Sequence, residues 1–279
     1  MTSKHCGPTR ASRLMAGLGL AASLSLFQGC VTTSSSGSPA ARAAGEVQTE
    51  SDTSDAERRA RVRMELAGAY FARGQWNTAL DEVKMALQSK PDMADGYNLR
   101  GLIYASMGEP ALAEDSFKRA LQLNPGDADA MHNFGWFLCQ RRRYPEAEVQ
   151  FNAAVAVPNY REAVRTYMAM GACQARNNQL DQAEKTLQKS YELDPANPTT
   201  ALNLAEVLYR RGDFERARFY VRRVNSVEQF VSAQTLWLAA RIEKKLGQTS
   251  QVNILGTQLS NRFPQSSEAL LYEKGRFDE

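Results

Sequence analysis

The sequence is poor in the residues that carry out catalysis and bind metals. It has 2 histidines among 279 residues, and only His132 lies beyond position 30. Its 4 cysteines stand at positions 6, 30, 139 and 173, so no pair has the close spacing of a zinc site. Neither a glycine-rich phosphate loop nor an HExxH or GxSxG motif occurs. We therefore expect no enzyme active site, no metal, no cofactor and no small-molecule substrate.

The charge balance gives no sign of nucleic-acid binding. The chain has 34 basic and 31 acidic residues, for a formal charge of +3. Lys4, Arg10 and Arg13 lie within the first 29 residues, which contain no acidic residue, so 31 of each sign remain beyond position 29. A neutral chain lacks the clustered positive charge that phosphate binding requires. We expect a protein partner and no nucleic acid.

Long hydrophobic runs are missing except near the start. A polar, basic stretch precedes fourteen mainly apolar residues, Leu14 to Phe27. A helix that spans a bilayer needs about twenty such residues. The run therefore predicts the core of a secretion signal over residues 1–29.

The residues after this run resemble a bacterial lipobox, with the sequence LFQGC over residues 26–30. The motif usually has Leu three places before the cysteine and a small residue two places before it, where this chain has Phe27 and Gln28. The resemblance implies that Cys30 is lipidated as the mature N-terminus. Val31 after it implies sorting to the outer membrane, with the protein facing the periplasm. A plain cleavable signal with an incidental cysteine is the alternative.

Residues 30–56 have the composition of a tether. They are rich in Ser, Thr, Ala and Gly, with almost no large apolar side chain. Such a segment cannot bury enough surface to offset the entropy of ordering. We expect a flexible linker that spans roughly 25 to 30 Å on average, followed by a folded part over residues 57–279.

The folded part repeats itself at intervals of 34 to 36 residues. Between stretches with apolar residues at helical spacing stand residues suited to the left-handed conformation that ends a helix: Gly74, Gly108, Arg142, Asn178, Gly212 and Gly247. Prolines, which cannot continue a helix, close five units: Pro91, Pro125, Pro158, Pro195 and Pro264. Alanines recur where two helices would touch closely: Ala79, Ala113, Ala147, Ala183 and Ala217. Each unit is therefore predicted to be a helical hairpin.

This pattern resembles the tetratricopeptide (TPR) repeat family, most strongly in residues 94–127. The family's positions are occupied there by Tyr97, Gly101, Tyr104, Gly108, Ala113, Phe117, Ala120 and Pro125. The resemblance implies an all-α, right-handed superhelical solenoid of about six repeats, near residues 60–93, 94–127, 128–163, 164–197, 198–232 and 233–266, plus a terminal helix from Ser267 to Lys274. One hairpin cannot bury its apolar face alone, so neighbours stack and leave a concave surface for binding.

Cys139 and Cys173 lie 34 residues apart, in the first helices of neighbouring repeats. In an oxidising periplasm, facing thiols join if their Cα atoms lie within about 7 Å. We expect a disulfide, although residues inserted near Tyr160 shift the register by two positions. Two buried free thiols are the alternative, and a zinc site shared with His132 is disfavoured.

The family resemblance also implies a partner-binding groove. In TPR proteins, positions 2, 5, 9, 12 and 13 of each first helix usually face the concave side. Carried over, the candidates are Met64, Phe71, Asn98, Leu102, His132, Trp136, Met168, Leu202, Tyr209, Trp237 and Arg241. This mixture suits a helix or extended segment of another protein, with Trp136 and Trp237 as anchors. Burial between repeats is the alternative for each of them.

Signal, tether and repeats together resemble the PilF/PilW family of type IV pilus biogenesis lipoproteins. The likeness is strongest at residues 123–125 (LNP), 133–139 (NFGWFLC) and 203–205 (NLA). It implies an outer-membrane pilot, held by its lipid anchor, that binds the pilus secretin and supports secretin multimerisation and pilus biogenesis. A TPR adaptor lipoprotein for peptidoglycan hydrolases or outer-membrane assembly factors shares the same architecture and is the competing hypothesis.

Overall fold

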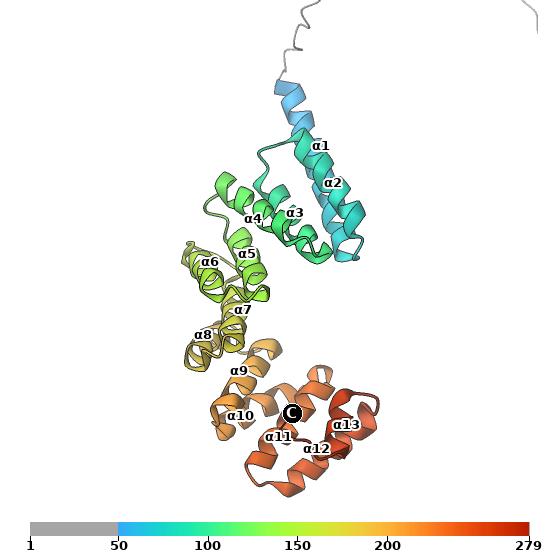
Figure 1. Ribbon diagram of the computed structural model, residues 1–279, viewed down its shortest axis with the longest axis vertical. Helices are drawn as coiled ribbons and strands as arrows, with labels where there is room; N and C mark the ends of the chain where they lie inside the picture. The colour runs from blue at the N-terminus through green and yellow to red at the C-terminus, as the bar shows by residue number, and fades with distance from the viewer. Residues whose placement is uncertain (1–49, 279) are drawn as a thin grey trace, which may run out of the picture. The chain divides into compact units, whose positions relative to one another are not determined.

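The computed structural model describes residues 50–278, which form thirteen α-helices and one short 3-10 helix, with no strand among them. In chain order the elements are α1 (Glu50–Ala72), α2 (Trp76–Ser89), α3 (Ala94–Met107), α4 (Pro110–Leu123), α5 (Ala128–Gln140), α6 (Tyr144–Ala156), α7 (Ala163–Arg176), α8 (Leu180–Leu193), α9 (Pro198–Arg211), α10 (Phe214–Asn225), η1 (Glu228–Phe230), α11 (Ala233–Lys245), α12 (Thr249–Arg262) and α13 (Ser267–Glu273) (Figure 1). The predicted signal and Cys30 lie outside the described residues.

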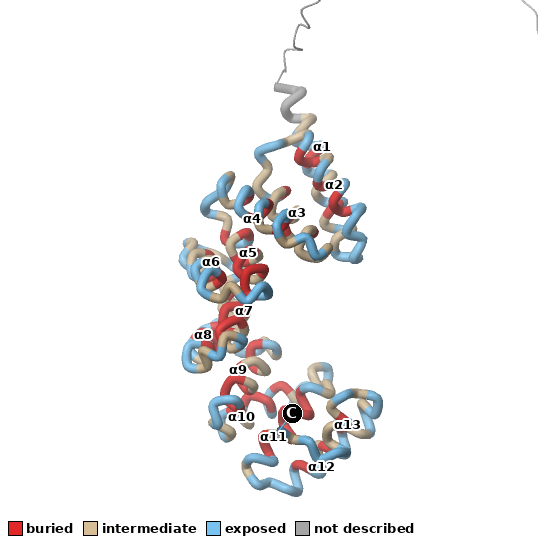
Figure 2. Tube along the Cα trace, viewed as in Figure 1, coloured by how far each residue is buried: buried red, intermediate tan, exposed pale blue. Residues whose placement is uncertain are grey.

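The helices pair in chain order, and each pair is one of the expected repeats. The pairs are α1–α2, α3–α4, α5–α6, α7–α8, α9–α10 and α11–α12. The second helix of each pair packs on the first helix of the next, and the first helices of successive repeats from α1 to α11 also touch. Buried residues therefore recur along the whole row of pairs (Figure 2). The all-α solenoid expected from the repeat pattern is confirmed.

The first helix begins earlier than the repeat pattern indicates. It starts at Glu50, inside the segment 30–56 that we expected to be a tether. Ala60 is fully buried, and Glu57 lies 2.5 Å from the ammonium of Lys90 at the end of α2. These contacts pack the start of the predicted folded part, residues 57–279, and α1 continues N-terminal to them as far as Glu50. Among residues 50–278, no helix combines the length and apolar character that crossing a bilayer requires.

The turns inside the repeats have the predicted backbone. The six expected residues have positive φ angles, from 60° to 83°: Gly74, Gly108, Arg142, Asn178, Gly212 and Gly247. After α3, for example, the amide of Gly108 donates to the Ala105 carbonyl and the amide of Glu109 to that of Tyr104. The left-handed residue thus satisfies carbonyls that the helix end leaves without partners.

Within a repeat, the two helices touch where one side chain is small and the other large. Gly101 of α3 faces Phe117 of α4, and a Cβ atom on Gly101 would lie 2.8 Å from the Phe117 ring. In the fifth repeat the same positions carry Ala205 and Val221, both buried in one cluster. A larger residue on the second helix therefore goes with a smaller one on the first, as close packing requires.

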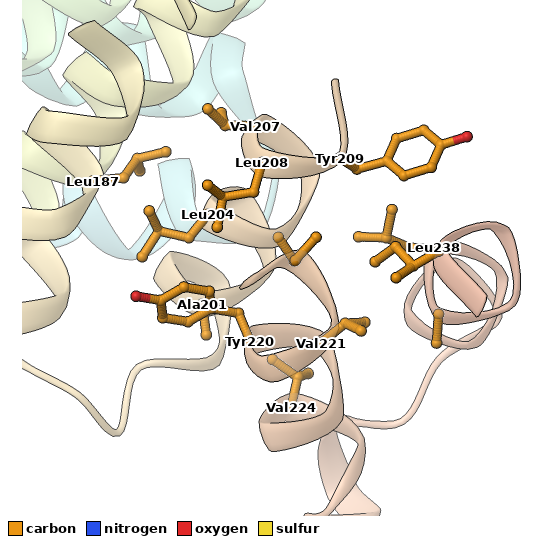
Figure 3. Packing of buried hydrophobic residues seen from close by; sticks show 14 of the residues in the cluster. Leu187, Ala201, Leu204, Val207, Leu208, Tyr209, Tyr220, Val221, Val224 and Leu238 are labelled. Carbon is orange, nitrogen blue, oxygen red and sulfur yellow. The ribbon is translucent and has the colours of Figure 1, made fainter. Parts of the chain in front are cut away.

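The core continues from one repeat to the next. In the cluster shown in Figure 3, Leu187 of α8, Leu204 of α9, Val221 of α10 and Leu238 of α11 pack together. All four are at most 3% exposed. Because each pair contributes to clusters shared with its neighbours, the row of helices is stabilised by nearest-neighbour packing.

The terminal helix α13 closes the row, ending at Glu273, one residue before the predicted Lys274. Its Tyr272 fills the space beside Gly256 of α12, which lacks the large side chain found there in other repeats. Ala269 is fully buried in the same cluster as Leu259. Without α13, this face of the sixth repeat would be left exposed.

Candidate partner-binding surface

The eleven predicted groove residues all lie on the first helices of the repeats, but they differ in accessibility. Eight are partly exposed: Met64, Phe71, Asn98, Leu102, Trp136, Met168, Leu202 and Arg241. Three are buried: His132 (7% exposed), Tyr209 (9%) and Trp237 (5%). The structure therefore keeps a partly open apolar surface along α1, α3, α5, α7 and α9, which we call the first-helix surface.

The middle of the first-helix surface combines an indole ring with a polar bridge. The side-chain amide of Asn133 on α5 donates to the Asn98 carbonyl oxygen on α3 over 3.2 Å. Leu102 and Trp136 pack on the same core cluster and are partly exposed. The Arg176 guanidinium of α7 lies over the Trp136 ring, 5.0 Å from its centroid. Such a platform offers an aromatic face and a cation to a partner segment.

His132 serves as a link between repeats. Its Nδ1 lies 2.9 Å from the Thr166 hydroxyl on α7, and its ring meets Phe151 edge-on. Burial lowers the pKa of His132 to about 4, and the nearby charge of Arg165 adds to the effect. The imidazole is therefore neutral at pH 7 and inaccessible to a partner. His132 was predicted to contact a partner in the groove, but in the structure it is buried between repeats, which was the alternative.

The insertion in the third repeat strengthens this link. The Tyr160 hydroxyl lies 3.1 Å from the Thr166 hydroxyl and donates to Asp129 on α5 over 3.3 Å. The Arg165 guanidinium pairs with the same carboxylate over 2.9 Å. The inserted residues thus fasten α7 to α5 at the end opposite the turn.

Cys139 of α5 and Cys173 of α7 are joined by a disulfide, with their Cα atoms 5.9 Å apart. Both residues are at most 4% exposed. The bond spans the same two helices as the His132 link. In this structure the two cysteines are structural, and neither sulfur is open to a metal or a partner.

Tyr209 lies under a neighbouring cation. The Arg241 guanidinium of α11 covers its ring at 4.5 Å from the centroid, and Phe214 packs beside it at 5.6 Å. Figure 3 shows the Tyr209 side chain reaching from α9 toward the α11 side of the cluster. A partner that approached this part of the surface would therefore contact Arg241, which covers the Tyr209 ring.

Trp237 is not available as an anchor. Its ring is buried in a cluster with Leu236 and Leu259, and Phe277 from the C-terminal segment lies against it, 5.1 Å between centroids. Sequence reasoning missed this segment, because residues after α13 have no place in the repeat pattern. Of the two tryptophans expected to anchor a partner, only Trp136 is partly exposed.

A second groove lies outside the first-helix surface. It has a volume of about 510 Å³ and is lined by Leu121, Phe134, Leu138 and Val149, among others, from α4, α5 and α6. Val149 is 63% exposed, the largest value among the exposed large hydrophobic residues. In the sequence, this groove is indicated only by Val149, an apolar residue at a position of α6 that the repeat pattern does not assign to a binding surface.

The acidic, histidine and cysteine side chains of the described residues do not gather into a metal-binding group. Among residues 50–278, no group of three or more His, Cys, Asp or Glu side chains could hold a metal ion. Glu243, 3% exposed, is buried under the Arg222 guanidinium at 2.7 Å, which makes it a structural ion pair between α10 and α11.

The sequence matches models of the tetratricopeptide repeat in three ranges. Models of the tetratricopeptide repeat match residues 94–127, 116–149 and 174–242. These ranges cover repeats in the middle of the row and the first helix of the last one. The repeat geometry described above and the matched ranges therefore agree.

Similarity extends along most of the folded part. The type IV pilus assembly protein PilF of Pseudomonas aeruginosa is 27% identical over 205 residues, 74% of this chain and 81% of the relative. A structure of P. aeruginosa PilF superposes with a TM-score of 0.70 at 25% identity, covering 79% of this chain and 99% of that one. A structure of the type IV pilus biogenesis factor PilW gives 0.71 at 29%, covering 76% and 96%. The chain is a tetratricopeptide-repeat protein and a relative of PilF and PilW.

Proposed function

We propose that the protein acts in type IV pilus biogenesis as a lipid-anchored outer-membrane pilot, which binds the pilus secretin and supports its multimerisation. The observation that carries the proposal is the likeness to PilF and PilW, which extends over about three quarters of the chain. PilF is described as an assembly protein and PilW as a biogenesis factor of the type IV pilus.

The first-helix surface supplies the physical means of binding. Leu102, Trp136 and Met168 are partly exposed on three consecutive first helices, and Leu202 continues the series. Apolar side chains on successive repeats suit an extended or helical segment, since binding buries them together. In this account a secretin segment lies along α3, α5, α7 and α9 with Trp136 as the central anchor.

The anchor and tether give the surface its location. We expect acyl chains on Cys30 to hold the protein at the membrane, because each buried methylene contributes about 0.8 kcal/mol and more than one chain makes attachment durable. The predicted tether was residues 30–56, of which 50–56 belong to α1; we expect its remaining residues to let the repeats reach a partner near the membrane. Repeats of this kind serve as protein-interaction scaffolds, and we propose no catalytic step.

Deletion and complementation test the proposal. Cells that lack the protein should lose heat-resistant secretin multimers from outer-membrane fractions and should lose surface pili. The unchanged chain should restore both, whereas Cys30→Ala should restore neither, because the surface is intact but misplaced. Normal multimers and pili in the deletion strain, with altered cell-wall hydrolase activity, would instead support the adaptor hypothesis.

A further inference from the structure

The end of the described chain turns back onto α11. After α13, Gly275 has a left-handed φ of 67°. Its amide donates to the Tyr272 carbonyl, and the amide of Arg276 donates to that of Leu271, both over 2.9 Å. This turn ends the helix and places Phe277 and Asp278 against α11. The predicted groove residues of the sixth repeat lie on that helix.

The segment Arg276–Asp278, which we call the tail, is held by three kinds of contact. The Phe277 ring packs on Trp237 at 5.1 Å, and the Lys244 ammonium lies 5.4 Å from the centre of that ring. The Phe277 carbonyl accepts a hydrogen bond from the Arg241 Nε at 3.1 Å. The Lys245 ammonium pairs with the Asp278 carboxylate at 2.7 Å and lowers its pKa.

The positions of these contacts on α11 are those through which partners are expected to bind. Trp237 and Arg241 are in the same register as Asn98 and Leu102 on α3. The tail therefore covers the last repeat's part of the groove with a segment of the chain itself. At this place the structure contains a peptide segment that packs on that register.

The tail contacts define a recognition chemistry. The aromatic side chain of the tail packs against an indole and an ammonium group of α11. An arginine of α11 donates a hydrogen bond to the backbone carbonyl of that aromatic residue, and a lysine pairs with the carboxylate of the residue after it. The Lys245–Asp278 pair is well exposed, with side chains 40% and 81% exposed, so it stabilises the closed arrangement weakly. A segment with the same chemistry, presented by another protein, can compete for this site.

We propose that the α11 face, made by Trp237, Arg241, Lys244 and Lys245, is a recognition site for a partner segment in which an aromatic residue is followed by an acidic residue. The tail occupies the site in cis, and the partner segment displaces it. The inference deepens the proposed function by naming the chemistry of one partner segment. Its test uses a synthetic peptide and no secretin, so the two can fail separately.

The experiment measures binding of a fluorescein-labelled peptide, Gly-Gly-Arg-Phe-Asp-Gly with an amidated end, to the purified full chain by anisotropy. Asp278→Lys removes one tail contact at an exposed position and places a cation beside Lys245, so the tail should leave the site. A chain whose site is closed nine-tenths of the time binds about tenfold more weakly than one whose site is open. Asp278→Lys should therefore bind the peptide several-fold more tightly than the unchanged chain, with about tenfold as the limit if the tail leaves completely.

Two controls fix the site and the chemistry. Adding Lys245→Glu to Asp278→Lys should abolish the gain in peptide affinity. The exchanged charges at positions 245 and 278 can pair again and hold the tail on α11, and the peptide carboxylate no longer has a lysine to bind. A peptide with alanine in place of phenylalanine should not bind any of the chains. Equal peptide affinity for the unchanged chain and Asp278→Lys, or no binding to either, would overturn the proposal.

A second readout follows the tail directly. In a chain carrying Trp76→Phe and Trp136→Phe, Trp237 is the remaining tryptophan. Its emission should shift to longer wavelength when Asp278→Lys is added, since the ring loses the cover of Phe277, and should return when the peptide binds. An emission spectrum that Asp278→Lys leaves unchanged would show that the tail does not leave, and the proposed exchange would be wrong.

Discussion

The Arg176 guanidinium of α7 lies over the Trp136 indole of α5, 5.0 Å from the ring centroid. The pair sits in the middle of the first-helix surface, and Leu102 packs against the same core cluster as Trp136. Of the three tryptophans in the chain, Trp237 is buried by the tail and Trp76 begins α2, outside this surface. Trp136 is therefore the tryptophan best placed to anchor a partner.

Trp136→Ala should weaken capture of the partner without unfolding the repeats. Truncating an anchor of this kind commonly costs about 2 kcal/mol of binding free energy, or roughly thirtyfold in Kd. Trp76→Ala is the matched control, since Trp76 is 42% exposed on a different helix. Titration of each variant with the purified partner measures both. Equal losses for the two variants, or none for Trp136→Ala, would count against the anchor.

The disulfide between Cys139 and Cys173 should stabilise the fold substantially. It closes a loop of 34 residues, which in the chain-entropy model contributes about 3 to 4 kcal/mol to the free energy of unfolding. Denaturant unfolding of the double variant Cys139→Ala, Cys173→Ala should show a loss of this size. Added reductant should reproduce the loss in the unchanged chain and have no effect on the variant. Two reactive thiols on the denatured, unreduced folded part, with Cys30 removed, would contradict the bond.

His132 should make stability depend on pH. Its pKa falls from 6.5 to about 4 on folding, so between these values the unfolded chain binds more protons. The free energy of unfolding therefore falls as pH drops from 6.5 toward 4, and the contribution is unchanged above 6.5. From pH 7.5 to 5 the expected loss is about 2 kcal/mol.

A variant without the imidazole isolates this effect. His132→Gln removes the titrating ring and leaves the Thr166 hydroxyl with Tyr160 as its partner, so its stability should fall less steeply over the same range. Urea unfolding at several pH values, compared between the two proteins, measures the difference in slope. Parallel curves for the unchanged chain and His132→Gln would show that His132 is not buried in its neutral form.

Arg142→Gly should stabilise the third repeat. Arg142 has a φ of 60° in the turn between α5 and α6, a conformation that costs a residue with a Cβ about 1 to 2 kcal/mol. Glycine avoids that cost but has more freedom in the unfolded chain, so the net gain should be about 0.5 to 1 kcal/mol. Thermal unfolding checks it, with Gly108→Arg as the reverse control, which should destabilise the second repeat.

The fold was predictable because the residues that end the helices and set their spacing are required for steric reasons. The helix turns occur at Gly74, Gly108, Gly212 and Gly247 since a left-handed residue must stand there. The facing of small and large side chains, such as Gly101 and Phe117, follows from the close approach of two helices. Each of these causes acts within one repeat, so it leaves a periodic mark on the sequence.

The site was less predictable because its accessibility depends on contacts outside the repeat. Trp237 is buried by Phe277, and Arg241, on the same face of α11, bonds to a carbonyl 36 positions away. His132 is buried and bonds to Thr166, which itself bonds to Tyr160 in an insertion that breaks the register. The repeat pattern also does not mark the first residues of α1, which begins at Glu50, ahead of the first repeat near residue 60. The repeat register determines which face of a helix a residue occupies, but it does not determine what covers that face.

In-cell photo-crosslinking at Leu102 tests the central claim most directly. Leu102 is partly exposed and packs against the same cluster as Trp136, whereas Val149, 63% exposed on α6, serves as the control position. A photo-reactive amino acid at position 102 should capture the pilus secretin in cells that form its multimers, and one at position 149 should not. Capture of the secretin from position 149 alone, or from neither position while multimers form normally, would contradict the account.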